Sequence, residues 1–458
     1  MFSRRVVLLS PGPELAAIRT DLVHPPLYYL LLQATTKLWG AGAVGTRALS
    51  LVCGILSIPL LWLVGSRLPD QRFAALSAAA LLAFNQSHIF YSQEARSYAW
   101  YTFLALIFLL WLFRIASITE RKVTWGEWAA GTALMIALVY THYVGAVYVA
   151  SAVVAFLVGR IPKQQKIGIF VCAAIAAVSF LPWLAAIAGV YRNKNGVGEN
   201  LDWQGHPDFY SLKQVFASAI GIPSLHGFTT LVLVSILVLS ISALVFTRDR
   251  ARSAIVLVLF AMATLPPVIV FFLSRPPIGL PLFGLRHFLP TIPCMILLCT
   301  YGLDCLAGRA APHRNAVALS GIAALLCIAA IPTFAALRST PSRIPYNAVS
   351  QEVLQDRAAG IPVYATWFYG IGEPVNFYCT WSCVAPLPDD ETSLPPRFVL
   401  LFRPHSSADT QFVSKLKQEG FDDSSLHYYT DGSHSLYGTE SAVLRRNATQ
   451  TPSPNQTH

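Results

Sequence analysis

The residues best suited to chemistry lie where apolar runs of the sequence end. Residues 91–98 (YSQEARSY) separate two such runs and carry Glu94 and Arg96 two positions apart. A carboxylate can serve as a base or a metal ligand, and a guanidinium can bind a phosphate through two parallel hydrogen bonds. An ionisable group embedded in a bilayer costs about 2.5–3.5 kcal/mol. The segment is therefore interpreted as part of a functional site, with a solvated polar hairpin as the alternative.

Three other positions have the same character. His24 precedes two prolines and two tyrosines, His142 lies in a short THY turn, and Arg286 and His287 precede another apolar run. The structural alternatives are a helix start for His24 and ordinary interfacial histidines for His142 and His287. Arg286 is a candidate for binding an anionic lipid headgroup, because it lies on the side opposite to the basic connectors described below.

The elements that must position these residues are membrane helices. Of the 458 residues, 54% are hydrophobic and 12% are charged, whereas a soluble domain carries about 25% charged residues. The sequence predicts an all-α polytopic membrane bundle of about ten transmembrane helices, each needing about 20 apolar residues. The predicted spans are 44–64, 73–91, 98–116, 126–142, 143–159, 167–188, 227–247, 253–273, 287–306 and 315–337.

Lys and Arg residues predict which ends of the spans face outside. The connectors after every odd-numbered span are basic, as around Arg121 and Arg250, and the positive-inside rule places them in the cytoplasm. The other connectors and residues 1–43 then face outside, which gathers the candidate site residues on one face. The run at 25–40 would be roughly 22 Å long as a helix, too short for a hydrocarbon core of roughly 30 Å. It is predicted to lie in the outer interface.

The remaining segments have simpler interpretations. Residues 338–446 predict a small extracytoplasmic α/β domain with strands at 362–365 and 398–402 and a helix at 412–419. The tail 447–458 is predicted to be disordered. Cys379 and Cys383 are a possible disulfide pair. The outer loop 189–226 suits a mobile cover over a site or a plain connector.

Several function classes receive no support from the sequence. The net charge is +10, but many of the basic residues lie in the short connectors, as topology signals do, so no nucleic-acid partner is expected. There is no Gly-rich phosphate loop, HExxH motif or CxxC pair. Nucleotide hydrolysis and a closed zinc site are therefore unsupported.

Taken together, these motifs resemble the GT-C superfamily of membrane glycosyltransferases, in particular the bacterial RgtA/B/C/D-like branch. That branch is related to the protein O-mannosyltransferases and the lipid A aminoarabinose transferase. The matching pieces, in family order, are HPPLYY at 24–29, Arg47, YSQEARSY at 91–98, THY at 141–143, LPW at 181–183 and RHFLP at 286–290.

The resemblance implies a transferase that moves a hexose or pentose from a polyprenyl-phosphate donor to an acceptor hydroxyl, with inversion, on the outer face of the cytoplasmic membrane. The acceptor would be a glycan, lipid or protein of the cell envelope, and membrane lipids would surround the enzyme. A divalent metal ion is possible as a cofactor. The catalytic candidates are Glu94 and Asp21, and the candidates for binding donor phosphate or substrate are Arg96, Arg286, His287, His24, Tyr28, Tyr91, Tyr98 and His142.

One departure from the family pattern concerns the N-terminus. The family carries an Asp-Glu pair after a first span, some distance before its His-Pro-Pro motif, and no such pair precedes His24 here. We therefore hypothesise that the chain begins late, lacking one span and the main catalytic acid, with Asp21 and Glu14 as the nearby substitutes. The competing hypotheses are a transporter or lipid flippase, a degenerate inactive transferase, and a non-catalytic membrane scaffold. Ionisable groups at span ends and the lack of internal repeats disfavour a transporter.

Overall fold

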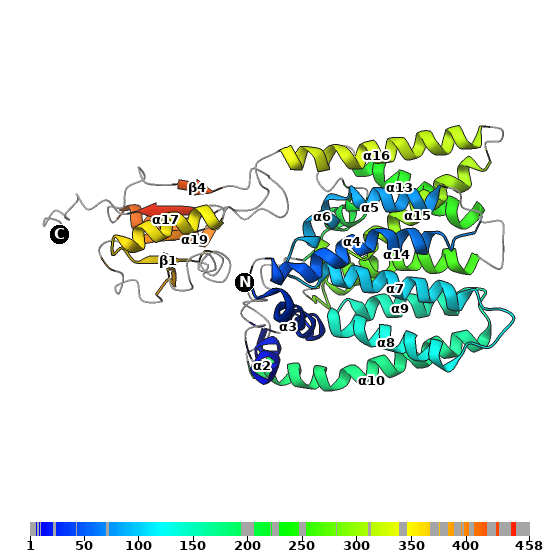
Figure 1. Ribbon diagram of the computed structural model, residues 1–458, viewed down its shortest axis with the longest axis horizontal. Coiled ribbons are helices and arrows are strands. Elements are labelled where there is room, and N and C mark those ends of the chain that lie inside the picture. The colour runs from blue at the N-terminus through cyan, green and yellow to red at the C-terminus, as the bar shows by residue number, and fades with distance from the viewer. Residues whose placement is uncertain are drawn as a thin grey trace, which may run out of the picture. The chain divides into compact units, whose positions relative to one another are not determined.

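The protein is described by a computed structural model that divides into two compact units, Phe2–Thr333 and Phe334–His458, with Met1 grouped with the second. Figure 1 shows the helices of the first unit and the sheet of the second. The structure describes all residues except 1–5, 7–8, 10, 22–23, 43, 70–72, 194–205, 220, 222–228, 247–252, 281, 310–312, 339–345, 367–374, 376–382, 389–394, 396–397, 403–406, 419–426, 430–440 and 446–458.

The first unit is a bundle of helices, which confirms the predicted multi-pass helical architecture in outline. Its helices are α2 (Pro11–Asp21), α3 (Leu27–Trp39), α4 (Gly45–Gly65), α5 (Ala74–Ala83), α6 (Gln86–Ser92), α7 (Tyr98–Ala116), α8 (Trp125–Thr141), α9 (Gly145–Val158), α10 (Lys163–Asn193), α12 (Phe209–Ser218), α13 (Thr229–Phe246), α14 (Ser253–Leu273), the 3-10 helix η1 (Leu285–Phe288), α15 (Thr291–Ala307) and α16 (Arg314–Arg338).

Length and composition explain why these helices form a membrane bundle. Among the described residues, four helices are long and apolar enough to span a bilayer, namely α4, α7, the Lys163–Gly189 part of α10, and α14. Five shorter apolar helices accompany them, including Gly145–Val158 and Thr291–Ala307. An isolated apolar helix cannot bury its side chains, so the helices pack in neighbouring pairs such as α4 with α7, α8 with α10, and α13 with α15.

One predicted span differs from the structure. Residues 73–91 form two helices, α5 and α6, that are interrupted at Phe84–Asn85. Asn85 is extended and its side-chain oxygen accepts the backbone N–H of His88, which begins a new helix. The side-chain amide of Asn85 also donates to the carbonyl oxygens of Ser218 and Ala219 at the end of α12. Hydropathy alone does not reveal such a break, because the residues on both sides are apolar.

The second unit holds a five-stranded sheet with strand order β2-β1-β3-β5-β4. The strands are β1 (Val363–Ala365), β2 (Ala385–Pro386), β3 (Val399–Phe402), β4 (His427–Tyr429) and β5 (Ser441–Arg445). β1 pairs parallel with β2 and β3, and β5 pairs antiparallel with β3 and β4. The helices α17 (Tyr346–Ala358) and α19 (Ser407–Gln418) contribute buried residues such as Val349, Val353, Val413 and Leu416 to the two apolar clusters of this unit.

Some predictions for the second unit can be compared with the structure. α19 begins at Ser407, earlier than the predicted start at residue 412. Cys383 is disulfide-bonded, while its predicted partner Cys379 lies outside the described residues. The tail 447–458, residues 194–205, 220 and 222–226 of the predicted loop 189–226, and the basic connector around Arg250 also lie outside the description.

Candidate functional site

Three histidines and a tyrosine from distant segments meet at one end of the first unit. His24 lies between α2 and α3, Tyr98 begins α7, His142 follows α8, and His287 belongs to η1. The ring centroid of His142 lies 4.8 Å from that of His287 and 5.7 Å from that of His24. Tyr98 lies between 6.2 and 6.4 Å from each of the three histidine rings. These four buried rings are called the histidine cluster below.

The local sequence explains how His142 reaches this position. It ends α8 in an extended conformation, and its Nδ1 accepts the backbone N–H of Val144 at 3.2 Å. The backbone N–H of Gly145 donates to the His142 carbonyl oxygen. A side chain at Gly145 would collide with the carbonyl oxygen of Leu138. The tight turn from α8 into α9 therefore requires glycine and directs the imidazole toward His24 and His287.

Aromatic residues of two spans support the cluster. The ring of Tyr101, one helical turn after Tyr98, stacks on His142 with centroids 5.2 Å apart. Tyr101 also packs edge-on against Tyr148 of α9, whose hydroxyl is hydrogen-bonded to that of Thr291 at the start of α15. The sequence analysis did not single out Tyr101. Its spacing of three residues from Tyr98 places both on one face of α7, which is a signal that could have identified it.

The turn that carries Glu94 and Arg96 is fixed from several sides. Ser50 of α4 donates to the carbonyl oxygen of Arg96 and shares a hydrogen bond with the hydroxyl of Tyr28. Gly54 and Ser92 are so close that a side chain at Gly54 would overlap the Ser92 side chain. The backbone of this turn is therefore held by α4, and through Tyr28 also by α3.

Arg96 and Arg286 lie within electrostatic reach of the cluster. Burial lowers the pKa of His24 well below its ordinary value, and the positive charges of Arg96 and Arg286 lower it further. Burial and the charge of Arg286 lower the pKa of His287 to about 4. The pKa of His142 is also lowered, by burial first and then by neighbours that include Arg286. The histidines are thus neutral near pH 7, and the charge at this end of the unit is carried by the guanidinium groups.

Several buried polar atoms at the cluster have no hydrogen-bond partner. They are both ring nitrogens of His24, the Nε2 of His142, the hydroxyl of Tyr101 and the hydroxyl of Ser97. A buried polar group without a partner costs about 1–3 kcal/mol, and such groups concentrate at functional sites. Together with two arginines, they form a buried surface suited to an anion that carries several hydrogen-bonding oxygens.

The other predicted residues have less direct relations to the cluster. Tyr91 packs on Tyr98 with centroids 5.1 Å apart. Glu94 is partly exposed in the same turn as Arg96, and its role stays a prediction. Asp21 is the last residue of α2, and its side chain lies outside the description. Glu14, earlier in α2, is buried, and neither of its carboxylate oxygens has a partner.

A metal site is not formed by the described side chains. No group of three or more His, Cys, Asp or Glu residues in the described part of the chain is arranged to hold a metal ion. The possible divalent metal near Glu94 stays a prediction.

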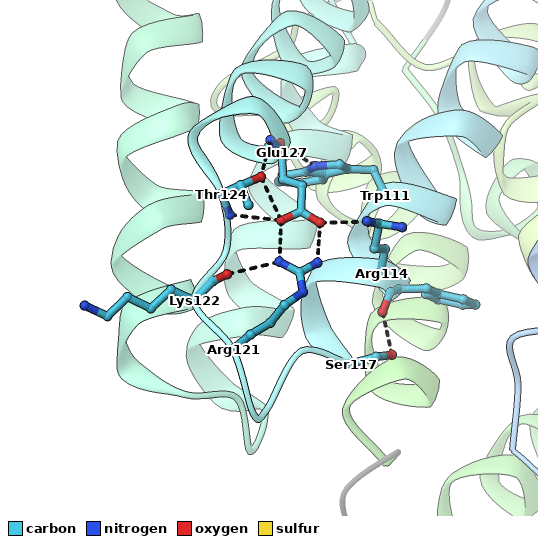
Figure 2. A network of polar contacts seen from close by, with 8 residues as sticks. Trp111, Arg114, Ser117, Arg121, Lys122, Thr124 and Glu127 are labelled. Carbon is cyan, nitrogen blue, oxygen red and sulfur yellow. Dashed lines mark hydrogen bonds and ion pairs between the residues drawn. The ribbon is translucent and has the colours of Figure 1, made fainter.

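The opposite ends of α7 and α8 carry a different arrangement (Figure 2). Glu127 accepts hydrogen bonds from Arg114 and Arg121 and completes a capping box with Thr124 at the start of α8. Arg114 follows Tyr98 by 16 residues of α7, which separates this network from Tyr98 by about 24 Å. The positive-inside rule predicted the basic connector at one end and the candidate site at the other, and the structure places them at opposite ends of α7.

Comparisons with known proteins give a family-model match and fold matches. Residues 23–185 match the family model described as dolichyl-phosphate-mannose-protein mannosyltransferase. The structure of ArnT from Cupriavidus metallidurans in the apo state matches with a TM-score of 0.53 and 15% sequence identity, over 94% of this chain and 89% of that chain. At this identity the match shows a fold shared with ArnT.

A second solved structure extends the comparison. The archaeal oligosaccharyltransferase AglB from Archaeoglobus fulgidus, in complex with an inhibitory peptide and a dolichol-phosphate, matches with a TM-score of 0.51 and 14% identity. The match covers 94% of this chain and 67% of that chain. Comparison with curated protein sequences gives no match. At these identities the likeness establishes a fold shared with these two structures, and the chemistry has to be argued from the residues of the site.

Proposed function

We propose that this chain transfers a sugar from a polyprenyl-phosphate donor to an acceptor hydroxyl on the outer face of the cytoplasmic membrane. The product would be a cell-envelope glycan, glycolipid or glycoprotein. The observation that carries the proposal is that two arginines from distant segments lie at the histidine cluster. Arg96 and Arg286 are both within electrostatic reach of buried His24, and the Nε of Arg286 lies 3.4 Å from the Nε2 of His287. A pair of guanidinium groups beside buried, unpaired polar atoms suits a phosphate.

The comparisons support the same ligand class. The AglB structure contains a dolichol-phosphate, and the matched family model takes its name from dolichyl-phosphate-mannose. A polyprenyl phosphate has an apolar tail for the bilayer and an anionic headgroup for the span ends. The position of the histidine cluster at one end of a bundle of apolar helices fits such a two-part ligand.

The proposed reaction makes two demands on the protein. The acceptor hydroxyl attacks the anomeric carbon with inversion while the lipid phosphate departs with the bonding electrons, so the departing group needs positive charge. Arg96 and Arg286 supply that charge, with Tyr28, Tyr91 and Tyr98 bordering the headgroup. Glu94, in the same turn as Arg96, orients the acceptor or a metal ion. The acceptor proton needs a base.

The proposal is tested by glycan and glycolipid mass spectrometry of the cell envelope in a deletion strain. A sugar that disappears on deletion and returns with the wild-type gene names the donor. The double variant Arg96→Gln/Arg286→Gln is expected to lower transfer about 10²–10³-fold, because each residue stabilises the departing phosphate. Arg121→Gln is the matched control, since Arg121 lies in the network at the other end of α7. Full transfer by a normally inserted double variant would contradict the site assignment.

A further inference from the structure

The three histidines of the cluster differ in which ring nitrogens are already engaged. The Nδ1 of His287 lies 2.7 Å from the carbonyl oxygen of Leu282, and because a carbonyl only accepts, this nitrogen carries the proton. The Nε2 of His287 faces the Nε–H of Arg286 at 3.4 Å, which requires a lone pair there. His287 is therefore held as a neutral ring with both nitrogens engaged.

His142 is held in the opposite tautomer. Its Nδ1 accepts the backbone N–H of Val144, so in the neutral ring the proton lies on Nε2. That Nε2–H is buried and has no partner. Protonating Nδ1 would turn it into a second donor facing the Val144 N–H and break this hydrogen bond. His142 is thus suited to donate a hydrogen bond and poorly suited to accept a proton.

His24 alone among the three has both ring nitrogens without a hydrogen-bond partner among the described residues. It is 3% exposed, and it lies within ring contact of Tyr29, Tyr98 and His142. Pro25 and Pro26 follow it directly. Because neither proline has a backbone N–H, they cannot donate to the imidazole as Val144 does to His142. The ring can therefore take up or release a proton without breaking any hydrogen bond made by its nitrogens.

The groups that face His24 explain when it would take up a proton. The charged and titratable neighbours that act on it are Arg96 after α6, and Arg286 and His287 of η1; His142 at the end of α8, Tyr29 of α3 and Tyr98 of α7 contact its ring. The charged groups among these are positive and oppose protonation. An anionic phosphate bound by the two arginines would offset their charge, and the imidazole would then become more basic.

We propose that His24 is the proton acceptor of the transfer reaction. It stays neutral while the donor phosphodiester, with one negative charge, is bound beside Arg96 and Arg286, and it becomes protonated as the departing phosphate gains its second charge. This inference rests on the proposed function. The acceptor oxygen forms a bond to the anomeric carbon and loses its proton to a free nitrogen of His24. The bond from the anomeric carbon to the phosphate oxygen breaks, and its electron pair stays on that oxygen. The phosphodiester, with one negative charge, thus becomes a monoester with two.

The electrostatic balance favours this assignment. The added negative charge on the departing phosphate appears as the imidazole gains its positive charge, so each stabilises the other. His142 contributes a hydrogen bond from Nε2–H to a phosphate oxygen, and His287 keeps Arg286 oriented. The three histidines thus have different roles in the proposed reaction, and only His24 changes its protonation state.

The experiment measures proton uptake on binding a short-chain prenyl phosphate. Purified full-length protein is titrated calorimetrically in buffers with different ionisation enthalpies, at pH values between 6 and 8. Wild type is expected to take up about one proton more per ligand than His24→Gln. Loss of a proton from the phosphate itself occurs with both proteins and cancels in the difference. His142→Gln is the matched control and is expected to bind more weakly while keeping the wild-type uptake.

The outcomes separate the inference from the proposed function. Equal proton uptake by wild type and His24→Gln, with ligand bound to both, overturns the role of His24 and leaves the proposed function in place. Failure of wild type to bind the prenyl phosphate overturns both. If His24→Gln does not fold, wild type alone is titrated with the prenyl phosphate at pH 8, where the free monoester already carries two negative charges. Proton uptake on binding then comes from the protein and supports the inference, and no uptake overturns it.

Discussion

The hydroxyl of Tyr148 lies 2.6 Å from the hydroxyl of Thr291, and this hydrogen bond joins residues 143 positions apart in the sequence. Tyr148 belongs to α9, shortly after the turn that carries His142, and Thr291 begins α15, directly after η1 and its His287. Both side chains are fully buried. The bond therefore fixes the distance between two segments that each contribute a ring to the histidine cluster.

Tyr148→Phe is expected to destabilise the protein by about 1–3 kcal/mol, because it leaves the buried hydroxyl of Thr291 without this partner. Thermal unfolding in detergent measures the loss. The control is the double variant Tyr148→Phe/Thr291→Val, which removes both hydroxyls. It is expected to be more stable than Tyr148→Phe alone. Equal stability of wild type and Tyr148→Phe would show that the hydrogen bond does not hold α9 to α15.

Asn85 links the break between α5 and α6 to the end of α12. Asn85→Ala removes the cap of α6, which costs about 0.5–2 kcal/mol, and also both amide hydrogen bonds to Ser218 and Ala219. Asn85→Asp keeps an oxygen to cap His88 but loses the two amide donors. We expect both variants to unfold at lower temperature than wild type. If Asn85→Asp retains full stability, the link to α12 does not contribute.

The raised pKa of buried Glu14 should make the stability of the protein depend on pH. Burial raises its pKa from 4.5 to about 7, against an opposing effect of Lys37. Between these values the folded protein holds a proton that the unfolded chain releases, so stability falls as the pH rises from about 4.5 to about 7 and then levels off. Glu14→Gln is expected to remove this decline, as thermal unfolding at pH 5 and pH 7.5 would reveal. An unchanged decline in Glu14→Gln would assign it to another group.

Much of the bundle could be predicted from the sequence because apolar length determines which segments cross a membrane. The predicted span 98–116 coincides with α7, and 253–273 coincides with α14. The break at Asn85 was missed because it depends on a side-chain cap and on carbonyl groups of α12, more than 130 residues away. Helix α2 was missed because its PGPELAAIRTD sequence is neither apolar nor strongly periodic.

The site could be predicted in part because the charge of the connectors indicates which span ends lie on the same side. Alternating charge in the connectors placed His24, Arg96, His142 and Arg286 at one end of the bundle, and the structure brings them within ring contact or electrostatic reach of one another. The difference between the histidines could not be predicted. It depends on whether a backbone N–H, as at Val144, or a carbonyl oxygen, as at Leu282, faces a ring nitrogen. Residue types do not encode that geometry.

Substitutions in the network around Glu127 should affect stability but not ligand binding at the histidine cluster. Its charged partners are well exposed, with side-chain exposures of 58% for Arg114 and 49% for Arg121, so water and salt weaken their attraction. Glu127→Gln removes the charge but can keep the capping box with Thr124, whereas Glu127→Ala removes both. We therefore expect a small decrease in melting temperature for Glu127→Gln and a larger one for Glu127→Ala.

Because the network lies at the far end of α7 from Tyr98, both variants are expected to bind a short-chain prenyl phosphate with wild-type affinity. A large loss of affinity in folded Glu127→Gln would mean that the Glu127 network is coupled to the histidine cluster.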